Sequence, residues 1–379
     1  MKIKILNIGL NLIITSLLMM GCNDWTELES ENKTDLEATI KTEEYYTALR
    51  EWKKTPGLPQ IFVWFDNWTG TYPTGENSLR GLPDSVTIAS NWGGHPKFDL
   101  TAERKADMEY VQKVKGTKVV VTLFSDYIGA DVPHEAIYDV GNSSDETIVR
   151  PAIRRYAEAI YDAVIKAGYD GFDWDYEPMG MPDPTHGSPL WRNKTQRRIF
   201  VEELGYWFGK NSQRTDRTGR KPAKEGLLFL IDGEIGVGSR MDKDWESQYV
   251  DYFVLQAYGG MSDWRMDGVI EDMSIHIDKN RITAEEVVKR TIITENFESY
   301  ASTGGGFLNM SNYIYKKGKI DQQIGGCGLY RTGFDYAPRG GKFVHDGAQE
   351  YYFLRSGITN LYKTFYERQK SKPKANESK

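Results

Sequence analysis

The sequence predicts an α/β protein that folds as a single (β/α)8 barrel. Eight short apolar runs alternate with longer amphipathic runs along the chain, an order typical of barrels with a parallel sheet. The apolar runs are almost continuous, which indicates strands that are buried on both faces. An open, doubly wound sheet is the alternative, but no glycine-rich phosphate loop follows the first strand run.

The predicted strands and helices alternate from residue 60 to the C-terminal helix. The strands cover residues 60–65, 85–90, 118–124, 171–177, 226–231, 252–258, 291–294 and 325–330. The helices cover residues 101–114, 147–167, 192–211, 306–317 and 346–369. Thr101 is a suitable N-cap for the first of these helices, and Gly168 is a suitable C-cap residue for the second.

The N-terminal 22 residues predict a secretion signal rather than part of the fold. Lys2 and Lys4 precede an apolar stretch over residues 5–20, and the stretch closes at Gly21-Cys22. The ending Leu18-Met-Met-Gly-Cys22 resembles a bacterial lipobox, with Met where Leu is usual. This resemblance implies that Cys22 is lipidated and that the protein is an outer-membrane lipoprotein.

The remaining segments outside the barrel are polar. Residues 23–45 predict a flexible tether, and the acidic residues just behind Cys22 resemble a surface-export signal, so we expect exposure on the cell surface. The catalytic barrel is expected over 46–370 and a disordered tail over 371–379. With Cys22 acylated, Cys327 has no cysteine in the chain to pair with, so the core must hold the fold.

The composition narrows the class of partner. A net charge of −6 argues against nucleic acid, whose phosphates favour a basic surface. The 10 Trp and 23 Tyr suit stacking on sugar rings, although a large core also uses aromatic residues. We predict no metal, nucleotide or flavin cofactor, and we expect a monomer with a lipid anchor in the membrane.

The segment from Tyr169 to Glu177 carries the strongest functional signal. Asp173, Asp175 and Glu177 occupy alternate positions, so a strand directs all three carboxyl groups to one face and the aromatic residues between them to the other. Crowded carboxyl groups in a poorly solvated wall repel, and at least one is expected to keep its proton near neutral pH. Such a group can act as a general acid in glycoside cleavage.

Two other interpretations of the acidic segment remain open. Acidic residues on a strand often form a solvated face, and alternating aspartates also bind divalent metals. Aromatic and apolar flanks argue against the first, and the spacing fits a strand rather than a calcium loop. The nearest histidine in the sequence, His186, lies outside the segment.

The run from Asp170 to Glu177 resembles the DGxDxDxE signature of glycoside hydrolase family 18 at every fixed position. That family includes chitinases, endo-β-N-acetylglucosaminidases and inactive lectin-like members. The resemblance implies that Glu177 is the acid and base, that Asp175 orients the 2-acetamido group of the sugar, and that Asp173 shares a proton with Asp175. Asp170 has the opposite parity and is expected to be structural.

Acids that line one strand lie on one side of the scissile bond, which suits neither the usual retaining nor the usual inverting geometry. The family uses a substrate-assisted route instead, in which the acetamido oxygen attacks the anomeric carbon. Gln256 and Tyr258 resemble the family's QxY pattern on the sixth strand. The pattern implies that the Tyr258 hydroxyl binds the acetamido carbonyl and that Gln256 lines the pocket.

Further candidate substrate-binding residues follow other predicted strands. A structural turn is an equally good interpretation for the loop that holds Trp92, and the match of Ser125 to a family serine is loose because the SxGG pattern is absent. The candidates are Trp64, Asp66, Asn67, Trp92, Ser125, Tyr330 and Arg331.

The predicted substrate is the chitobiose core of N-linked glycans. Gln256, together with Tyr330 where family chitinases usually carry Trp, resembles the endo-β-N-acetylglucosaminidase branch. Long segments at 66–83, 126–146 and 178–189 are suited to glycan-antenna pockets. The expected activity is retaining cleavage of GlcNAc-β1,4-GlcNAc; a chitinase and a non-hydrolytic glycan-binding lipoprotein are the alternatives.

Overall fold

The computed structural model describes most of the chain from Lys41 to Ser371. The described residues are 41–71, 75–93, 96–124, 132, 139–177, 193–210, 212, 222–235, 246–273, 282–336 and 350–371. Cys22, Ser125, the signal segment, most of the expected tether and the tail after residue 371 lie outside them. No helix in the described part of the chain is both long and apolar enough to span a membrane.

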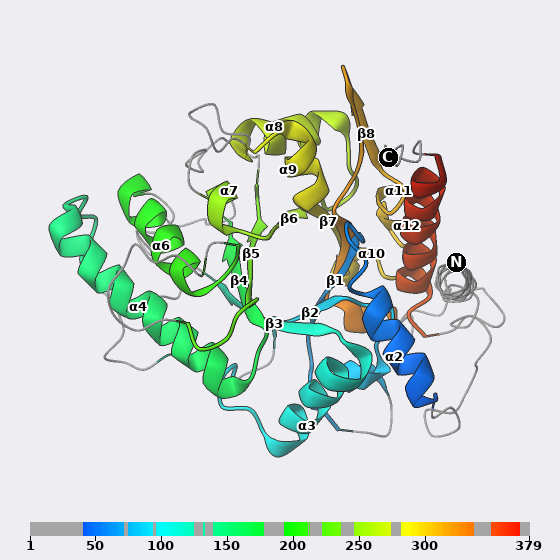
Figure 1. The fold of residues 1–379 in the computed structure, drawn as a ribbon, viewed down its shortest axis with the longest axis horizontal. Helices are drawn as coiled ribbons and strands as arrows, with labels where there is room; N and C mark the ends of the chain where they lie inside the picture. The colour runs from blue at the N-terminus through cyan, green and yellow to red at the C-terminus, as the bar shows by residue number, and fades with distance from the viewer. Residues whose placement is uncertain are drawn as a thin grey trace, which may run out of the picture.

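Eight parallel strands close into a barrel, with helices outside it (Figure 1). The order around the barrel is β1-β10-β7-β6-β5-β4-β3-β2, so the first and last strands of the barrel pair directly. This confirms the predicted single-domain (β/α)8 fold. The strands are β1 (Gln60–Phe65), β2 (Ile88–Asn91), β3 (Lys118–Phe124), β4 (Gly171–Tyr176), β5 (Leu228–Gly233), β6 (Tyr252–Gln256), β7 (Thr291–Asn296) and β10 (Gly326–Tyr330).

The α-helices that surround the barrel range from single turns to more than five turns. They are α2 (Glu43–Trp52), α3 (Ala102–Tyr110), α4 (Glu146–Ala167), α6 (Lys194–Trp207), α7 (Glu246–Tyr249), α8 (Asp263–Met273), α9 (Ala284–Arg290), α10 (Phe297–Tyr300), α11 (Phe307–Met310) and α12 (Tyr352–Ser371). Thr101 caps α3 through Arg104 N, and Gly168 ends α4 in the left-handed conformation, as predicted. Helix α2 begins inside the segment that we expected to be tether.

One predicted helix, over 306–317, is wrong. Only Phe307–Met310 is helical there, and Ile314–Lys317 forms β8, which pairs antiparallel with β9 (Ile320–Gln323) outside the barrel. The hairpin turns at Gly318, whose φ of 61° favours glycine. The apolar spacing over so short a stretch fits either period, and pairing with β9 decides for a strand.

The barrel interior divides into an apolar lower layer and a polar upper layer. Phe62, Ile88, Val120, Leu230, Val254 and Ile292 pack together in the interior and fill the lower layer. Two positions further along their strands, Ser90, Thr122 and Asp232 lie nearer the carboxyl ends, and Asp173 of β4 pairs in register with Thr122. Strand alternation thus directs polar side chains into the barrel at the end where such barrels hold their active sites.

Close approach of two strands requires glycine in β10. A Cβ atom at Gly328 would lie 2.0 Å from the Phe62 carbonyl oxygen on β1, and one at Gly326 would lie 2.2 Å from the Gln60 carbonyl oxygen. Any larger residue would push the strands apart at the point where the barrel closes. Outside this seam, Trp52 of α2 donates its Nε1–H to the Tyr366 hydroxyl of α12 at 2.6 Å, which joins the two helices.

A buried aspartate of α3 holds the segment that follows β1. Asp107 accepts hydrogen bonds from Trp68 Nε1 at 2.8 Å, Ser78 Oγ at 2.7 Å, and the backbone N–H groups of Leu79 and Arg80 at 2.7 and 3.2 Å. This segment begins at Asp66 and Asn67, beside the upper mouth of the barrel. Asp107 therefore fixes the conformation of one wall of the mouth.

We expect Asp107→Ala to lower the free energy of unfolding by roughly 2–3 kcal/mol, because buried donors would lose their acceptor. Urea unfolding followed by circular dichroism measures the change. The matched control is Asp99→Ala, at an exposed position just before α3, which should unfold as the wild type does. Equal stability of the two variants would show that Asp107 does not hold this segment.

Candidate active site

The acids and the aromatic residues of β4 lie on opposite faces, as the alternation predicts. Asp173 lies in the barrel interior, fully buried, where Thr122 Oγ1 and Trp64 Nε1 donate to its Oδ2 at 2.8 and 3.1 Å. Trp174 points outward and packs edge-to-face on Phe200 of α6, with ring centroids 5.2 Å apart. The strand thus joins a polar wall inside to an aromatic core outside.

Burial sets the protonation of Asp173. Removal from water raises the pKa of this carboxyl to about 6, while hydrogen bonds, that from Thr122 foremost, limit the rise. Thr122 is itself oriented by Ser90, whose Oγ lies 2.5 Å from Thr122 Oγ1. The deepest acid of the row therefore titrates between the ordinary range of aspartate and neutrality.

Asp175 lies one step higher on the same wall and is 5% exposed. Burial raises its pKa well above the ordinary value, and the charges of Glu177 and Asp173 raise it further. The positive charge of Lys97 acts in the opposite direction. Lys97 is buried and donates from Nζ to the Thr122 carbonyl oxygen at 2.6 Å, so it is a fixed part of the site.

Glu177 follows the last residue of β4 and is half-buried at the mouth of the barrel. Its Oε1 accepts a hydrogen bond from Gln256 Nε2 at 2.6 Å. Gln256 ends β6, two strands away, so the amide fixes the carboxyl group across the mouth. The sequence motif and the strand end place the proposed acid where a substrate can reach it.

Tyr258 lies just beyond β6 and faces the same acids. Burial, and then the negative charges of Asp232, Glu177 and Asp175, raise the pKa of its phenol far above the ordinary value. The hydroxyl therefore stays protonated over the working pH range and is able to donate a hydrogen bond. The structure thus gathers Glu177, Asp175, Asp173 and Tyr258, together with Gln256, at one end of the barrel.

Aromatic rings form one side of the mouth. The Tyr330 ring lies edge-to-face against Trp92, with centroids 4.9 Å apart, and against Trp64 at 6.1 Å. It also lies 6.0 Å from the Tyr258 ring. Residues from β1, from β10 and from the segments that follow β2 and β6 therefore meet above the acids and offer a surface suited to a sugar ring.

Arg331 closes this side. Its Nε donates to Asp66 Oδ2 at 3.0 Å and its Nη1 to Glu298 Oε1 at 2.5 Å. Both ion pairs tie it to protein carboxylates, and its backbone is held at a φ of 54°. Asn67 also has a positive φ, of 53°, and is exposed, so it is part of the turn after β1. Ser125 lies outside the described residues.

The sequence patterns did not predict two buried residues of the site. Asp232, at the end of β5, pairs in register with Asp175 and is 1% exposed. Gln256 Nε2 lies 3.3 Å from its Oδ1. A signal for Asp232 was present, because an acidic residue directly follows the strand predicted after the one that carries Asp173 and Asp175. That predicted strand ended at residue 231, so Asp232 was left outside it. Lys97 gave no such signal.

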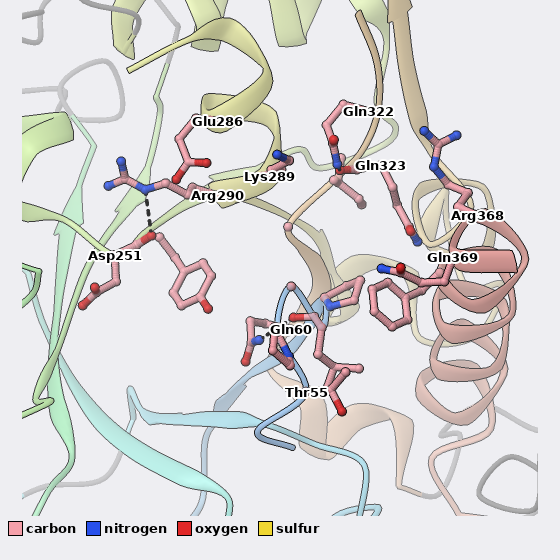
Figure 2. A pocket seen from close by; sticks show the side chains of 18 of the residues that line it. Thr55, Gln60, Asp251, Glu286, Lys289, Arg290, Gln322, Gln323, Arg368 and Gln369 are labelled. Carbon is pink, nitrogen blue, oxygen red and sulfur yellow. Dashed lines mark hydrogen bonds between the residues drawn. The ribbon is translucent and has the colours of Figure 1, made fainter. Parts of the chain in front are cut away.

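A separate cavity of about 720 Å³ opens at the other end of the barrel. Its lining includes Gln60, Leu228 and Tyr252, which begin three of the strands. Figure 2 shows Asp251 and Arg290 on one side of it, where Arg290 Nε donates to the Asp251 carbonyl oxygen at 3.0 Å. The carboxyl row at the other mouth does not take part in this cavity.

Asp170, the first residue of the motif, holds the barrel together from outside. Its Oδ2 accepts from Gln112 Nε2 at 2.8 Å and from Val119 N at 3.1 Å, and its Oδ1 pairs with Lys224 Nζ at 3.0 Å.

Within the described residues, no group of three or more histidine, cysteine or acidic side chains has the arrangement of a metal site.

A row of buried carboxyl groups that rises to a half-buried glutamate at the carboxyl end of a (β/α)8 barrel defines a glycosidase-type site. The chain belongs to glycoside hydrolase family 18. The family model described as glycoside hydrolase family 18, BT1044-like, matches residues 26–338.

Two solved structures are similar over most of their length. A selenomethionine glutamate-to-glutamine variant of BT1044 is 26% identical, with a TM-score of 0.61, covering 88% of this chain and 97% of that one. An endo-β-N-acetylglucosaminidase from Cordyceps militaris is 17% identical, with a TM-score of 0.55, covering 85% and 97%. At this identity, the likeness to the Cordyceps enzyme shows a shared fold alone. No curated protein matches the sequence.

Proposed function

We propose that the protein is a retaining endo-β-N-acetylglucosaminidase that cleaves the GlcNAc-β1,4-GlcNAc core of N-linked glycans with the help of the substrate's own acetamido group. The observation that carries this proposal is the arrangement at the end of β4. Glu177 reaches the mouth of the barrel, Asp175 lies directly below it, and Gln256 bonds Glu177 Oε1 at 2.6 Å. These carboxyl groups share one wall, so neither is placed to attack the far side of a sugar that the other protonates.

In the first step Glu177 donates a proton to the glycosidic oxygen while that oxygen leaves the anomeric carbon. The acetamido carbonyl oxygen of the same sugar attacks that carbon and forms an oxazolinium ion. Asp175 accepts a hydrogen bond from the acetamido N–H and offsets the developing positive charge. The neutral Tyr258 hydroxyl donates to the acetamido oxygen and orients it for attack.

In the second step water opens the oxazolinium ion. Glu177, now a carboxylate, takes a proton from the water as it attacks the anomeric carbon, and the acetamido group is restored. Two displacements at one carbon return the original anomeric configuration. The products are a glycan with a free reducing GlcNAc and a protein that keeps one GlcNAc on its asparagine.

Support for an N-glycan substrate comes from the residues around the acids. Gln256 stands at the pocket wall, and Tyr330 rather than Trp closes the aromatic side of the mouth. Both features match the endo-β-N-acetylglucosaminidase branch better than the chitinases. The likeness to the Cordyceps enzyme adds the shared fold alone.

Mass spectrometry of a glycoprotein panel treated with the protein tests the substrate. We expect single GlcNAc residues left on asparagine and glycans that end in one GlcNAc. Release of chitobiose from chitin with untouched glycoproteins would contradict the proposal and favour a chitinase. Binding to glycans without any product would favour a non-hydrolytic lectin.

We further propose that the enzyme is anchored through Cys22 to the outer membrane and faces the outside of the cell. The lipobox-like ending before Cys22 and the acidic residues behind it support this placement. We expect Cys22→Ala to move the protein from the membrane fraction to the soluble fraction, and protease added to whole cells to digest the wild type. Equal membrane recovery of both forms would contradict the anchor.

A further inference from the structure

Asp232 is the acid of this site that the family motif does not contain. It lies on β5, next to β4 in the barrel, and is in register with Asp175. It is 1% exposed, and its carboxyl group is within hydrogen-bonding reach of both Asp173 and Asp175. Three carboxyl groups from two strands therefore share one dry space below Glu177.

The hydrogen bonds around this space favour a proton on one of the carboxyl groups. Gln256 Nε2 donates to Asp232 Oδ1 at 3.3 Å, and Thr122 and Trp64 donate to Asp173 Oδ2. Asp232 Oδ2 and Asp173 Oδ1 are buried, and among the described residues neither oxygen accepts a hydrogen bond of ordinary geometry, although the Ser90 hydroxyl also stabilises the charge on Asp173. Two ionised carboxylates within hydrogen-bonding reach of each other would repel, whereas a proton kept on Asp232 gives it a donor toward Asp173.

We propose that Asp232 is a positioning residue of the reaction, which rests on the function proposed above: its carboxyl group keeps a proton and donates it to the Asp173–Asp175 pair, so that this pair carries one negative charge toward the acetamido group. No bond to the substrate is formed by Asp232, and its proton is not consumed. Its effect on the reaction passes through Asp175.

The surrounding charges favour Asp232 as the residue that keeps the proton. It faces Asp173 and Asp175 of β4, Glu177 just after that strand and Tyr258 just after β6, while the cation Lys97 acts on Asp175. Burial and then these negative charges raise the pKa of Asp232 well above its ordinary value. Its hydrogen bond in turn lowers the pKa values of Asp173 and Asp175, which favours their ionisation.

Paired substitutions separate this role from a structural one. Asp232→Asn keeps an N–H donor toward the pair, so the acidic limb of its kcat/KM profile should stay near the wild-type position. Asp232→Ala removes the donor, so Asp175 should ionise less readily and the acidic limb of the kcat/KM profile should move up by on the order of one pH unit. The proposal would be overturned if Asp232→Ala lost activity while the acidic limb of its kcat/KM profile stayed in place. It would also be overturned if both variants moved that limb by the same amount.

The matched control is Asp251→Asn, which neutralises a half-buried aspartate in the cavity at the opposite end of the barrel (cavity in Figure 2). Burial raises the pKa of Asp251 to about 6, much as it does for Asp173. Its loss should leave the catalytic pH profile unchanged. A shift of the acidic limb in this variant would mean that any buried charge moves it, which would contradict a specific role for Asp232.

Urea unfolding across pH 4 to 8 tests whether Asp232 keeps its proton in the folded protein, and it requires no activity measurement. It compares the wild type with Asp232→Asn, so it remains decisive if Asp232→Ala does not fold. A carboxyl whose pKa is raised by folding binds its proton more tightly in the native state, so it favours the native state at low pH and this contribution is lost as pH rises. The wild type should therefore lose up to about tenfold in folding equilibrium constant per pH unit relative to Asp232→Asn.

A stability difference that is constant with pH would show that Asp232 is ionised and would overturn the proposal. If the stability difference depends on pH but the wild type cleaves no glycan, the proton on Asp232 is supported and the proposed function is refuted. The two failures are thus distinguishable.

Discussion

Glu177→Gln is expected to lower kcat on a glycoprotein substrate by about 10²- to 10⁴-fold, the usual contribution of a general acid. The amide has the same shape and still offers an oxygen to Gln256 Nε2, which lies 2.6 Å from Glu177 Oε1. It has no acidic proton for the leaving oxygen. The glycan dissociation constant, measured by calorimetry, should therefore change little while turnover is lost.

The leaving group provides a sharper test of the same residue. A nitrophenyl glycoside of N-acetylglucosamine or chitobiose releases a phenolate that needs little protonation, so the loss in the rate of bond cleavage should be much smaller there. Glu225→Gln, at an exposed position before β5, is the matched control and should behave as the wild type. An equal loss on both kinds of substrate would contradict the assignment of Glu177 as the acid.

Asp175→Asn is expected to lower turnover of the intact glycan by about 10²- to 10³-fold, similar to the loss of one preorganised electrostatic partner. The amide cannot offset the positive charge that forms on the acetamido group. A sugar oxazoline, in which the ring is already formed, should still be processed by the variant. Release of sugar from each substrate, followed by chromatography, measures both rates.

Stability separates this effect from misfolding. Burial and the neighbouring acids raise the pKa of Asp175, so its ionisation opposes the native state as pH rises. Removing the charge should leave the protein at least as stable as the wild type at neutral pH. Failure of the folded variant to process the oxazoline would contradict the role given to Asp175.

The acid row was predictable from the sequence because it depends on the period of a strand alone. Asp173 and Asp175 lie inside the barrel, Trp174 packs outside it, and Glu177 follows the strand end. The fold followed from the same signal, repeated in eight apolar runs.

Asp232 and Lys97 were not predictable because their roles arise from tertiary contacts. Asp232 precedes a glycine, and such a pair usually indicates a turn. Its meaning depends on the register between β4 and β5, which brings it level with Asp175. Lys97 lies in a segment of glycine, histidine and proline, and only the folded chain shows that its ammonium group is buried.

The helix predicted over 306–317 was wrong for a different reason. Tyr313, Tyr315 and the lysines that follow fit either period over so short a stretch, and the hairpin is formed only by pairing with 320–323. Such errors affect the outside of the barrel. They do not displace the strand ends that carry the site.

In the proposed mechanism the acetamido oxygen of the sugar is the nucleophile. Substrates whose acetyl group carries none, one, two or three fluorine atoms test this role, because fluorine withdraws electrons from that oxygen. We expect kcat/KM to fall steeply with each added fluorine while substrate binding changes little. Cleavage at equal rates along the series would show that a protein carboxylate or a water attacks instead.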